Sequence, residues 1–123
     1  MTPSYLAPAK VNLCLNVTGR RSNGYHELVS VAGFTAFGDY LSLCPVLLGA
    51  GEDAQTELQI SGPFAADLRS AGGDTLIIAA YLALAKHLPL DMFHFHLEKH
   101  IPLGGGLGGG SADAAACLRA LAQ

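Results

Sequence analysis

The feature that most constrains this chain is a run of glycine near its end, where six of the seven residues 104–110 are glycine. Glycine lacks a Cβ, so such a segment can adopt left-handed conformations and let a ligand lie directly against its peptide N–H groups. The run continues into residues 111–121, which are rich in alanine and other strong helix formers. A helix that starts beside free N–H groups binds phosphate, because its dipole is positive at that end. The sequence therefore predicts a phosphate-binding loop followed by a helix that begins near Ser111.

Three known glycine motifs fit this segment less well. Gly104, Gly106 and Gly109 match the spacing of the dinucleotide fingerprint, but five residues separate them from the strand expected to end at Glu98, and no acidic residue follows at about twenty positions. A Walker loop requires Gly-Lys-Ser/Thr, which the sequence lacks here. The glycine loop of protein kinases joins two strands, whereas this one runs into a helix. A flexible linker is the alternative without a function.

Charge and hydropathy argue against several classes of partner. The net charge is -3, and the basic residues cluster only at Arg20 and Arg21, which does not favour a nucleic-acid surface. The longest apolar run, residues 76–85, is too short to cross a bilayer, and the first residues do not resemble a secretion signal. We therefore expect a cytoplasmic protein that binds a small molecule and neither nucleic acid nor membrane. The cysteines are odd in number and widely spaced, as expected for reduced thiols: Cys14, Cys44 and Cys117.

The length of 123 residues corresponds to one domain or a part of one. Half of the residues are apolar, which is enough for a hydrophobic core. The last helix keeps its apolar pattern at Leu118 and Leu121 and reaches Gln123 without a stop signal. We therefore expect a truncated chain, and its oligomeric state is not predicted.

The first strand is expected at residues 11–17, which alternate between apolar and polar side chains. One face carries Val11, Leu13, Leu15 and Val17, and the other carries Lys10, Asn12, Cys14 and Asn16. The Cα atoms of Lys10 and Asn12 would lie about 7 Å apart. An ammonium and a carboxamide at that spacing can contact one substrate. The alternative is a strand whose polar face only meets solvent.

A hairpin is expected after this strand, because residues 19–24 end in the turn signal Asn23-Gly24. Tyr25 and His26 stand on the returning strand. A tyrosine ring offers a stacking plane, and an imidazole can donate and accept hydrogen bonds. Together they suit recognition of a planar heterocycle. The alternative is an ordinary aromatic residue at the start of a strand.

The remaining elements suggest an α+β domain. Further strands are expected at residues 28–37, 40–48, 55–61 and 93–99, with a turn at 37–39, a loop at 49–53 and an irregular segment at 61–73. Residues 75–87 are expected to form a helix with Asp74 as its N-cap. This helix is apolar nearly all round, which predicts burial between the sheet and another layer.

The strand at residues 93–99 carries two histidines. Its alternation places Phe93, Phe95 and Leu97 toward the core and His94, His96 and Glu98 on the opposite face. The two histidines could ligate a metal ion, but the sequence supplies no third and fourth ligand for a zinc site. A polar sheet face is the preferred interpretation.

Three segments resemble the 4-diphosphocytidyl-2-C-methyl-D-erythritol kinase family, within the superfamily of galactokinase, homoserine kinase, mevalonate kinase and phosphomevalonate kinase (GHMP). They are residues 8–13, 24–28 and 101–115. The resemblance implies the α+β fold of a GHMP kinase N-terminal domain, of the type called ribosomal protein S5 domain 2-like, with a mixed sheet and helices packed on one side. It also implies that residues 1–123 form an incomplete ATP-binding domain and that a C-terminal domain is missing.

The resemblance further implies ATP-dependent phosphorylation of the 2-hydroxyl of 4-diphosphocytidyl-2-C-methyl-D-erythritol, in the non-mevalonate pathway to isoprenoid precursors. In that family the residue matching Lys10 is catalytic, and those matching Asn12, Tyr25 and His26 bind the substrate, the last two through its cytosine. Mg²⁺ accompanies ATP, and the hydroxyl matching Ser111 lies near the metal and the phosphates. The segment implied to bind ATP comprises Pro102, Leu103, Gly104, Gly105, Gly106, Leu107, Gly108, Gly109, Gly110, Ser111 and Ala112.

The family's catalytic aspartate belongs to a later segment that residues 1–123 do not contain. Asp113 is a poor replacement, because it is expected in the first turn of the helix, where a carboxylate simply favours the dipole. The isolated chain is therefore expected to be inactive. Two other functions stay open: another GHMP small-molecule kinase, of the homoserine or mevalonate type, and a noncatalytic nucleotide-binding fragment.

Overall fold

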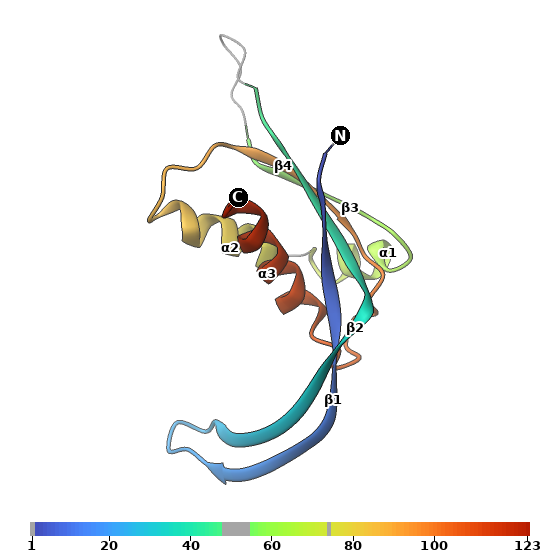
Figure 1. The fold of residues 1–123 in the computed structure, drawn as a ribbon, viewed down its shortest axis with the longest axis vertical. Coiled ribbons are helices and arrows are strands. Elements are labelled where there is room, and N and C mark those ends of the chain that lie inside the picture. The colour runs from blue at the N-terminus through green and yellow to red at the C-terminus, as the bar shows by residue number, and fades with distance from the viewer. Residues whose placement is uncertain (1, 48–54, 74) are drawn as a thin grey trace.

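The computed structural model describes residues 2–47, 55–73 and 75–123 (Figure 1). Its strands and helices follow in the order β1 (Ser4–Arg20), β2 (His26–Pro45), β3 (Glu57–Ser61), α1 (Ala65–Ser70), α2 (Thr75–Ala85), β4 (Phe93–Glu98) and α3 (Gly109–Leu121). The strands form one sheet in the order β1-β2-β4-β3. The pairs β1/β2 and β2/β4 are antiparallel, and β3/β4 is parallel. The predicted mixed sheet of an α+β fold is therefore confirmed.

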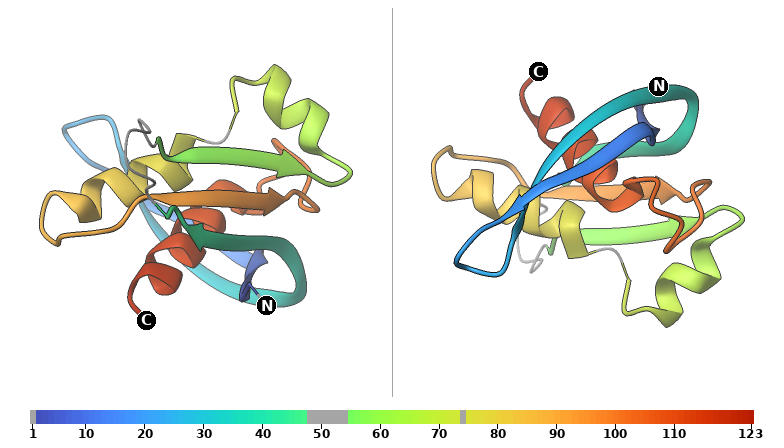
Figure 2. Two further views of the ribbon diagram at one scale, coloured as in Figure 1. Left: turned by 90° about the horizontal axis from the view of Figure 1, so that it is seen from above. Right: turned by 90° about the horizontal axis from the view of Figure 1, so that it is seen from below.

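Helices α2 and α3 lie next to each other on one side of the sheet, as both views of Figure 2 show. Phe95 and Leu97 of β4 are almost fully buried there, as their alternation predicts, and they pack in a core with Ile77 of α2 and Cys117 of α3. The other members of this core are Ala7, Leu41, Leu68, Tyr81 and Ala116. The described residues include no helix that is long and apolar enough to span a membrane.

The distal halves of β1 and β2 extend past the helices as a curved arm (Figure 1). The apolar side chains of the arm are exposed in this structure: Leu13 by 72%, Val17 by 64% and Val29 by 59%. The pairing of the two strands shifts between Pro8 and Lys10, between Asn12 and Cys14, and between Val17 and Gly19. Such irregularities bend a strand pair. The strict alternation predicted for residues 11–17 is therefore interrupted after Asn12.

β2 runs without a break from His26 to Pro45, so the turn predicted at residues 37–39 is wrong. Gly38 there is not a turn residue but a point of close backbone approach, opposite Pro8 of β1. A Cβ on Gly38 would stand 2.7 Å from the carbonyl carbon of Ala7 and 2.8 Å from the Cα of Pro8. The glycine is therefore needed for strand pairing, and the sequence signal for a turn was misleading.

Replacing Gly38 by alanine is expected to destabilise the domain by about 1–3 kcal/mol, because the new methyl group must push the two strands apart. Gly33→Ala is the matched control in the same strand, since a Cβ there meets nothing within 4 Å. Urea unfolding of both variants gives the comparison. Equal midpoints for the two variants would contradict the close approach.

Three other expectations need correction. Residues 61–73 are not wholly irregular, because α1 forms within them and buries Ala65 and Leu68. α2 ends at Ala85 rather than at residue 87, and it is not buried all round, since Leu76 and Leu82 are about half exposed. The proposed N-cap Asp74 and the loop at residues 49–53 lie outside the described residues.

Candidate functional site

The glycine loop connects the end of β4 to α3 and has the backbone shape expected of an anion site. Gly104, Gly106 and Gly108 have φ values of 72°, 69° and 67°, which only glycine adopts without strain. α3 begins at Gly109, two residues before the predicted start, and Gly108 is its N-cap without a side-chain hydrogen bond. The N–H groups of the first helical turn have no intrahelical partner, and they form the positive end of the helix dipole. This is the arrangement that binds phosphate.

A cavity of about 310 Å³ lies against the loop. Residues 102–110 form one wall, and the opposite wall comes from the end of α1, the start of α2 and Lys99. Leu68 and Leu76 contribute apolar surface to it. The cavity thus combines the backbone of the glycine loop with apolar walls, which suits a small ligand held through backbone groups.

Lys10 lies directly against the loop. Its backbone N–H donates to the Leu107 carbonyl at 2.9 Å, and a Cβ on Gly108 would stand 3.7 Å from both Cβ and Cε of Lys10. The lysine does not line the 310 Å³ cavity itself. The structure therefore brings two segments of the predicted site into contact at Gly108, although Lys10 and Gly108 are 98 residues apart in sequence.

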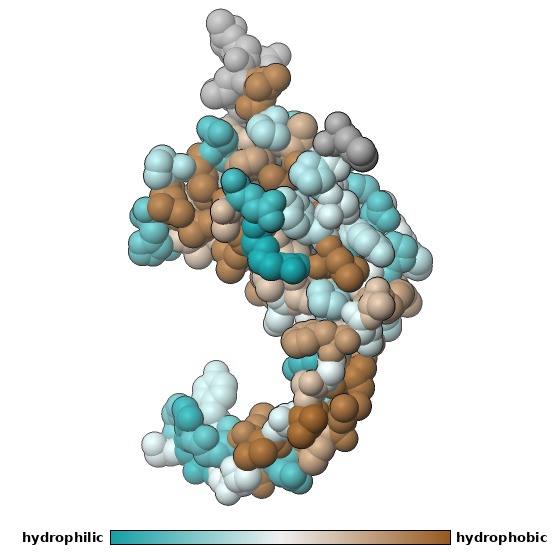
Figure 3. All heavy atoms as spheres, viewed as in Figure 1, coloured by the Kyte–Doolittle hydropathy of each residue, from teal (hydrophilic) through white to brown (hydrophobic). Residues whose placement is uncertain are grey.

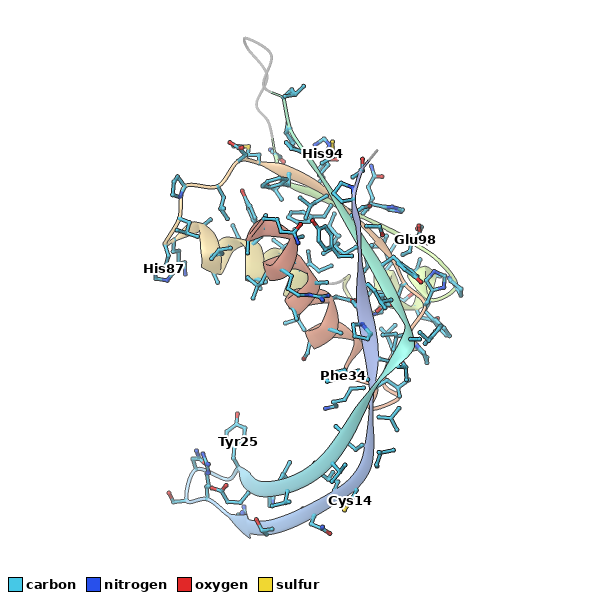
Figure 4. All side chains as sticks on the ribbon, viewed as in Figure 1. Cys14, Tyr25, Phe34, His87, His94 and Glu98 are labelled. Atoms are coloured by element: carbon cyan, nitrogen blue, oxygen red, sulfur yellow. The ribbon has the colours of Figure 1, made fainter. Side chains whose placement is uncertain are left out.

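Asn12 is exposed on β1, two residues farther into the arm, where its Oδ1 accepts a hydrogen bond from the Ser30 hydroxyl at 3.0 Å. Tyr25 and His26 lie at the far end of the arm and are exposed, Tyr25 by 73%. Figure 4 shows the Tyr25 side chain pointing from the arm toward the helices. Figure 3 shows the hollow that separates the end of the arm from the rest of the molecule. Tyr25 thus borders an open space, and none of the three residues lines the cavity beside the loop.

The predicted hairpin turn that carries Tyr25 is present. Gly24 has a φ of 88°, and its N–H donates to the Arg21 carbonyl at 3.0 Å. Asn23 Oδ1 accepts a hydrogen bond from the backbone N–H of Tyr25 at 3.0 Å, and Arg21 forms an ion pair with Glu27. The turn therefore fixes the backbone of Tyr25 while leaving its ring free to meet a ligand.

A buried ionic cluster that the sequence did not predict lies beneath the loop. Lys99 Nζ donates to Asp39 Oδ2 at 2.6 Å and to Asp113 Oδ2 at 2.8 Å, and all three residues are at most 3% exposed. The signal was present in β4, because the alternation that buries Phe95 and Leu97 puts Lys99 on the same face. A buried lysine requires a carboxylate partner. The sequence alone did not indicate that Asp39 would supply it.

The expected place of Asp113, in the first turn of the helix, also needs correction. α3 begins earlier than predicted, so Asp113 lies beyond its first turn and is fully buried. Its Oδ1 atom has no hydrogen-bond partner within the described part of the chain. The carboxyl group therefore serves Lys99 rather than the helix dipole.

The pKa values of the cluster reflect this burial. Burial raises the pKa of Asp113 from 3.8 to about 8; the hydrogen bond from Lys99 opposes the rise, and the Asp39 carboxylate adds to it. Burial lowers the pKa of Lys99, but its bonds to Asp113 and Asp39 outweigh this effect and raise it. Near neutral pH the Asp113 carboxyl group is thus protonated beside the Lys99 ammonium.

Stability should therefore decrease with rising pH through Asp113. Its folded pKa lies above its unfolded value, so folding takes up a proton between those two values, and this contribution is lost as pH rises to about 8. Relative to Asp113→Asn, the wild type is expected to lose up to about 1.4 kcal/mol of unfolding free energy per pH unit in this range. Urea unfolding of both proteins at about pH 5, 6.5 and 8 measures the difference. Parallel pH profiles would show that Asp113 is already ionised.

One protein family and several known kinases resemble this chain. Residues 75–123 match the family described as GHMP kinases N terminal domain. The 4-diphosphocytidyl-2-C-methyl-D-erythritol kinases of Agrobacterium fabrum and Dinoroseobacter shibae are each 47% identical to the chain; the matches cover 94% and 95% of it and 38% and 37% of those relatives. A crystal structure of 4-(cytidine 5'-diphospho)-2C-methyl-D-erythritol kinase matches with a TM-score of 0.68 and 39% identity, over 97% of this chain and 39% of the other.

The residues that match the GHMP kinase N-terminal domain family include β4, the glycine loop and α3, and the crystal structure matches nearly the whole chain. Within that superfamily, the chain is similar to the N-terminal part of 4-diphosphocytidyl-2-C-methyl-D-erythritol kinases. The expected resemblance is thus confirmed. The chain spans about 38% of the length of the curated relatives it matches.

Proposed function

We propose that residues 1–123 are the N-terminal ATP-binding domain of a kinase that phosphorylates the 2-hydroxyl of 4-diphosphocytidyl-2-C-methyl-D-erythritol, in the non-mevalonate route to isoprenoid precursors. The observation that carries this proposal is the contact between Lys10 and the glycine loop at Gly108. It puts a cation beside a row of backbone donors, in a chain whose relatives bear this kinase name. The reaction would take place in the cytoplasm.

Phosphoryl transfer requires in-line positioning and neutralisation of charge on the transferred group. We assign the ATP phosphates to residues 102–112, where the N–H groups of the loop and of the first turn of α3 are oriented for anions. Lys10 would stabilise the charge that develops on the transferred phosphoryl group, since it reaches the loop from β1. The fixed backbone of the loop supplies the orientation.

Mg²⁺ would accompany ATP and neutralise part of the phosphate charge. The described residues contain no cluster of three metal-ligating side chains. We therefore propose that the nucleotide itself holds most of the ion's coordination. In this chain we assign the exposed hydroxyl of Ser111, the third residue of α3, to a position beside the ion.

The acceptor would lie in the open space between the loop and the end of the arm. Asn12 stands next to Lys10 on β1, and Tyr25 and His26 would hold the cytosine by stacking and by hydrogen bonding. None of the described residues that line the cavity at the loop carries a carboxyl group, and Asp39 and Asp113 are buried against Lys99. We propose that the general base and a second domain belong to the part of the polypeptide that corresponds to the remaining length of the relatives.

The test is an assay of the longer polypeptide with MgATP and three separate acceptors: 4-diphosphocytidyl-2-C-methyl-D-erythritol, mevalonate and homoserine. The expected result is turnover of the cytidine compound alone, inhibited by cytidine nucleotides, with no turnover by residues 1–123. Turnover of mevalonate or homoserine instead would support another GHMP kinase. ATP binding without phosphorylation of any acceptor would support a noncatalytic nucleotide-binding protein.

A further inference from the structure

Asp39 of β2 is a fully buried carboxylate that neither the glycine motif nor the proposed reaction uses. Both of its oxygens are occupied. Oδ1 accepts hydrogen bonds from the backbone N–H groups of His100 at 2.6 Å and Ile101 at 2.7 Å, and Oδ2 accepts from Lys99 Nζ at 2.6 Å. A carboxylate that accepts three hydrogen bonds in a buried setting fixes the groups around it firmly.

These contacts reach both ends of the glycine loop. His100 and Ile101 form the segment through which the chain leaves β4 and starts the loop. Lys99 links Asp39 to α3, because its Nζ also donates to Asp113 Oδ2 at 2.8 Å. The ammonium lies directly below the start of that helix, because a Cβ on Gly109 would be 3.0 Å from Lys99 Nζ. Asp39 therefore anchors the start of the loop directly and its end through one lysine.

The loop between these anchors has little to hold its own shape. A Cβ added to Gly104 or Gly106 would meet nothing within 4 Å, so no neighbouring group packs closely there. The backbone bond from Lys10 to Leu107 secures its middle. The path of residues 102–108 is thus set mainly by how its two ends are fixed relative to each other.

We propose that Asp39 is a positioning residue that sets the separation of the loop's start from the N-terminus of α3, and so directs the loop amides toward one phosphate position. It does not contact the reacting atoms. The placement of the loop follows from these contacts alone, whereas the effect on ATP kinetics rests on the function proposed above. Misplacement of binding groups by about 1 Å can lower the rate of an enzyme by about two orders of magnitude.

Asp39→Asn tests the proposal with little change in shape. The amide oxygen can still accept from His100 and Ile101, but the amide NH₂ would face the Lys99 ammonium, so the connection to α3 is lost. Asp39 Oδ2 and Asp113 Oδ2 both lie within hydrogen-bond distance of the one Lys99 Nζ, so the two carboxyl groups are neighbours. In the double variant Asp39→Asn/Lys99→Met, the new amide can therefore donate to Asp113 and restore a link. Asp91→Asn, at an exposed carboxylate far from the loop, is the matched control.

The measurements are amide hydrogen exchange of residues 103–110 and the KM values, in the full-length protein that contains this chain. For Asp39→Asn we expect exchange of these amides to be about tenfold faster and KM for ATP to rise by about tenfold, with KM for the acceptor unchanged. The double variant should recover most of both effects, and Asp91→Asn should show neither.

Unchanged exchange at residues 103–110 in Asp39→Asn would overturn the proposal. So would exchange that is faster by the same factor in β2, β4 and α3, since that pattern reports a loss of global stability. If the loop amides respond as expected but no variant, including the wild type, binds ATP, the proposed function fails and the positioning role of Asp39 stands.

Discussion

Methionine in place of Lys10 is expected to lower kcat for phosphoryl transfer by about 100- to 1,000-fold in the full-length protein, the usual cost of removing one group that stabilises transition-state charge. The loop should stay in place, because Lys10 holds it through its backbone N–H, which donates to Leu107. Methionine keeps the length of the side chain along Gly108 and removes only the charge. The loss should therefore appear in kcat more than in the affinity for ATP.

Lys86→Met is the control for this experiment, since Lys86 is an exposed lysine beyond the end of α2. Steady-state assays of both variants with varied ATP give kcat and KM separately. A kcat of Lys10→Met within about threefold of the control would exclude Lys10 from the chemical step.

The parts of the fold that could be predicted from the sequence were those whose signal is local. Alternation in β4 predicted which of its residues are buried, and Asn23-Gly24 predicted the hairpin turn. Gly38 could not be interpreted in this way. Position 38 requires glycine because the backbone of Ala7, 31 residues away in sequence, approaches it closely. A local sequence pattern cannot distinguish such an approach from a turn.

The candidate site shows the same division. The phosphate loop was predictable because consecutive glycines at a helix start have few other uses, and the structure adds the contact with Lys10. The Lys99 cluster depends on Asp39, 60 residues upstream. The local alternation could therefore indicate that Lys99 is buried, but it could not identify its partner. Asp113 was misjudged because two more glycines belong to α3 than expected, which moves this residue into the interior.

Lys99→Met is expected to destabilise the domain by about 3–5 kcal/mol, because it leaves two buried carboxyl groups without their cation. That is a large part of the total stability of a typical domain, about 5–15 kcal/mol. Asp39 would keep its bonds from His100 and Ile101, but Asp113 would lose the bond from Lys99. Urea unfolding measures the loss, with Lys86→Met again as the control, expected within about 0.5 kcal/mol of the wild type.

A second substitution shows whether the effect comes from the bond between Lys99 and Asp113 or from lost packing. Asp113→Asn replaces the carboxyl group by an amide of nearly the same size. If the bond dominates, Lys99→Met should cost less in the Asp113→Asn background than in the wild type, with a coupling of about 0.5–3 kcal/mol. Strictly additive losses would instead assign the role of Lys99 to its aliphatic stem, and the buried cluster would then contribute packing rather than electrostatic support to the loop.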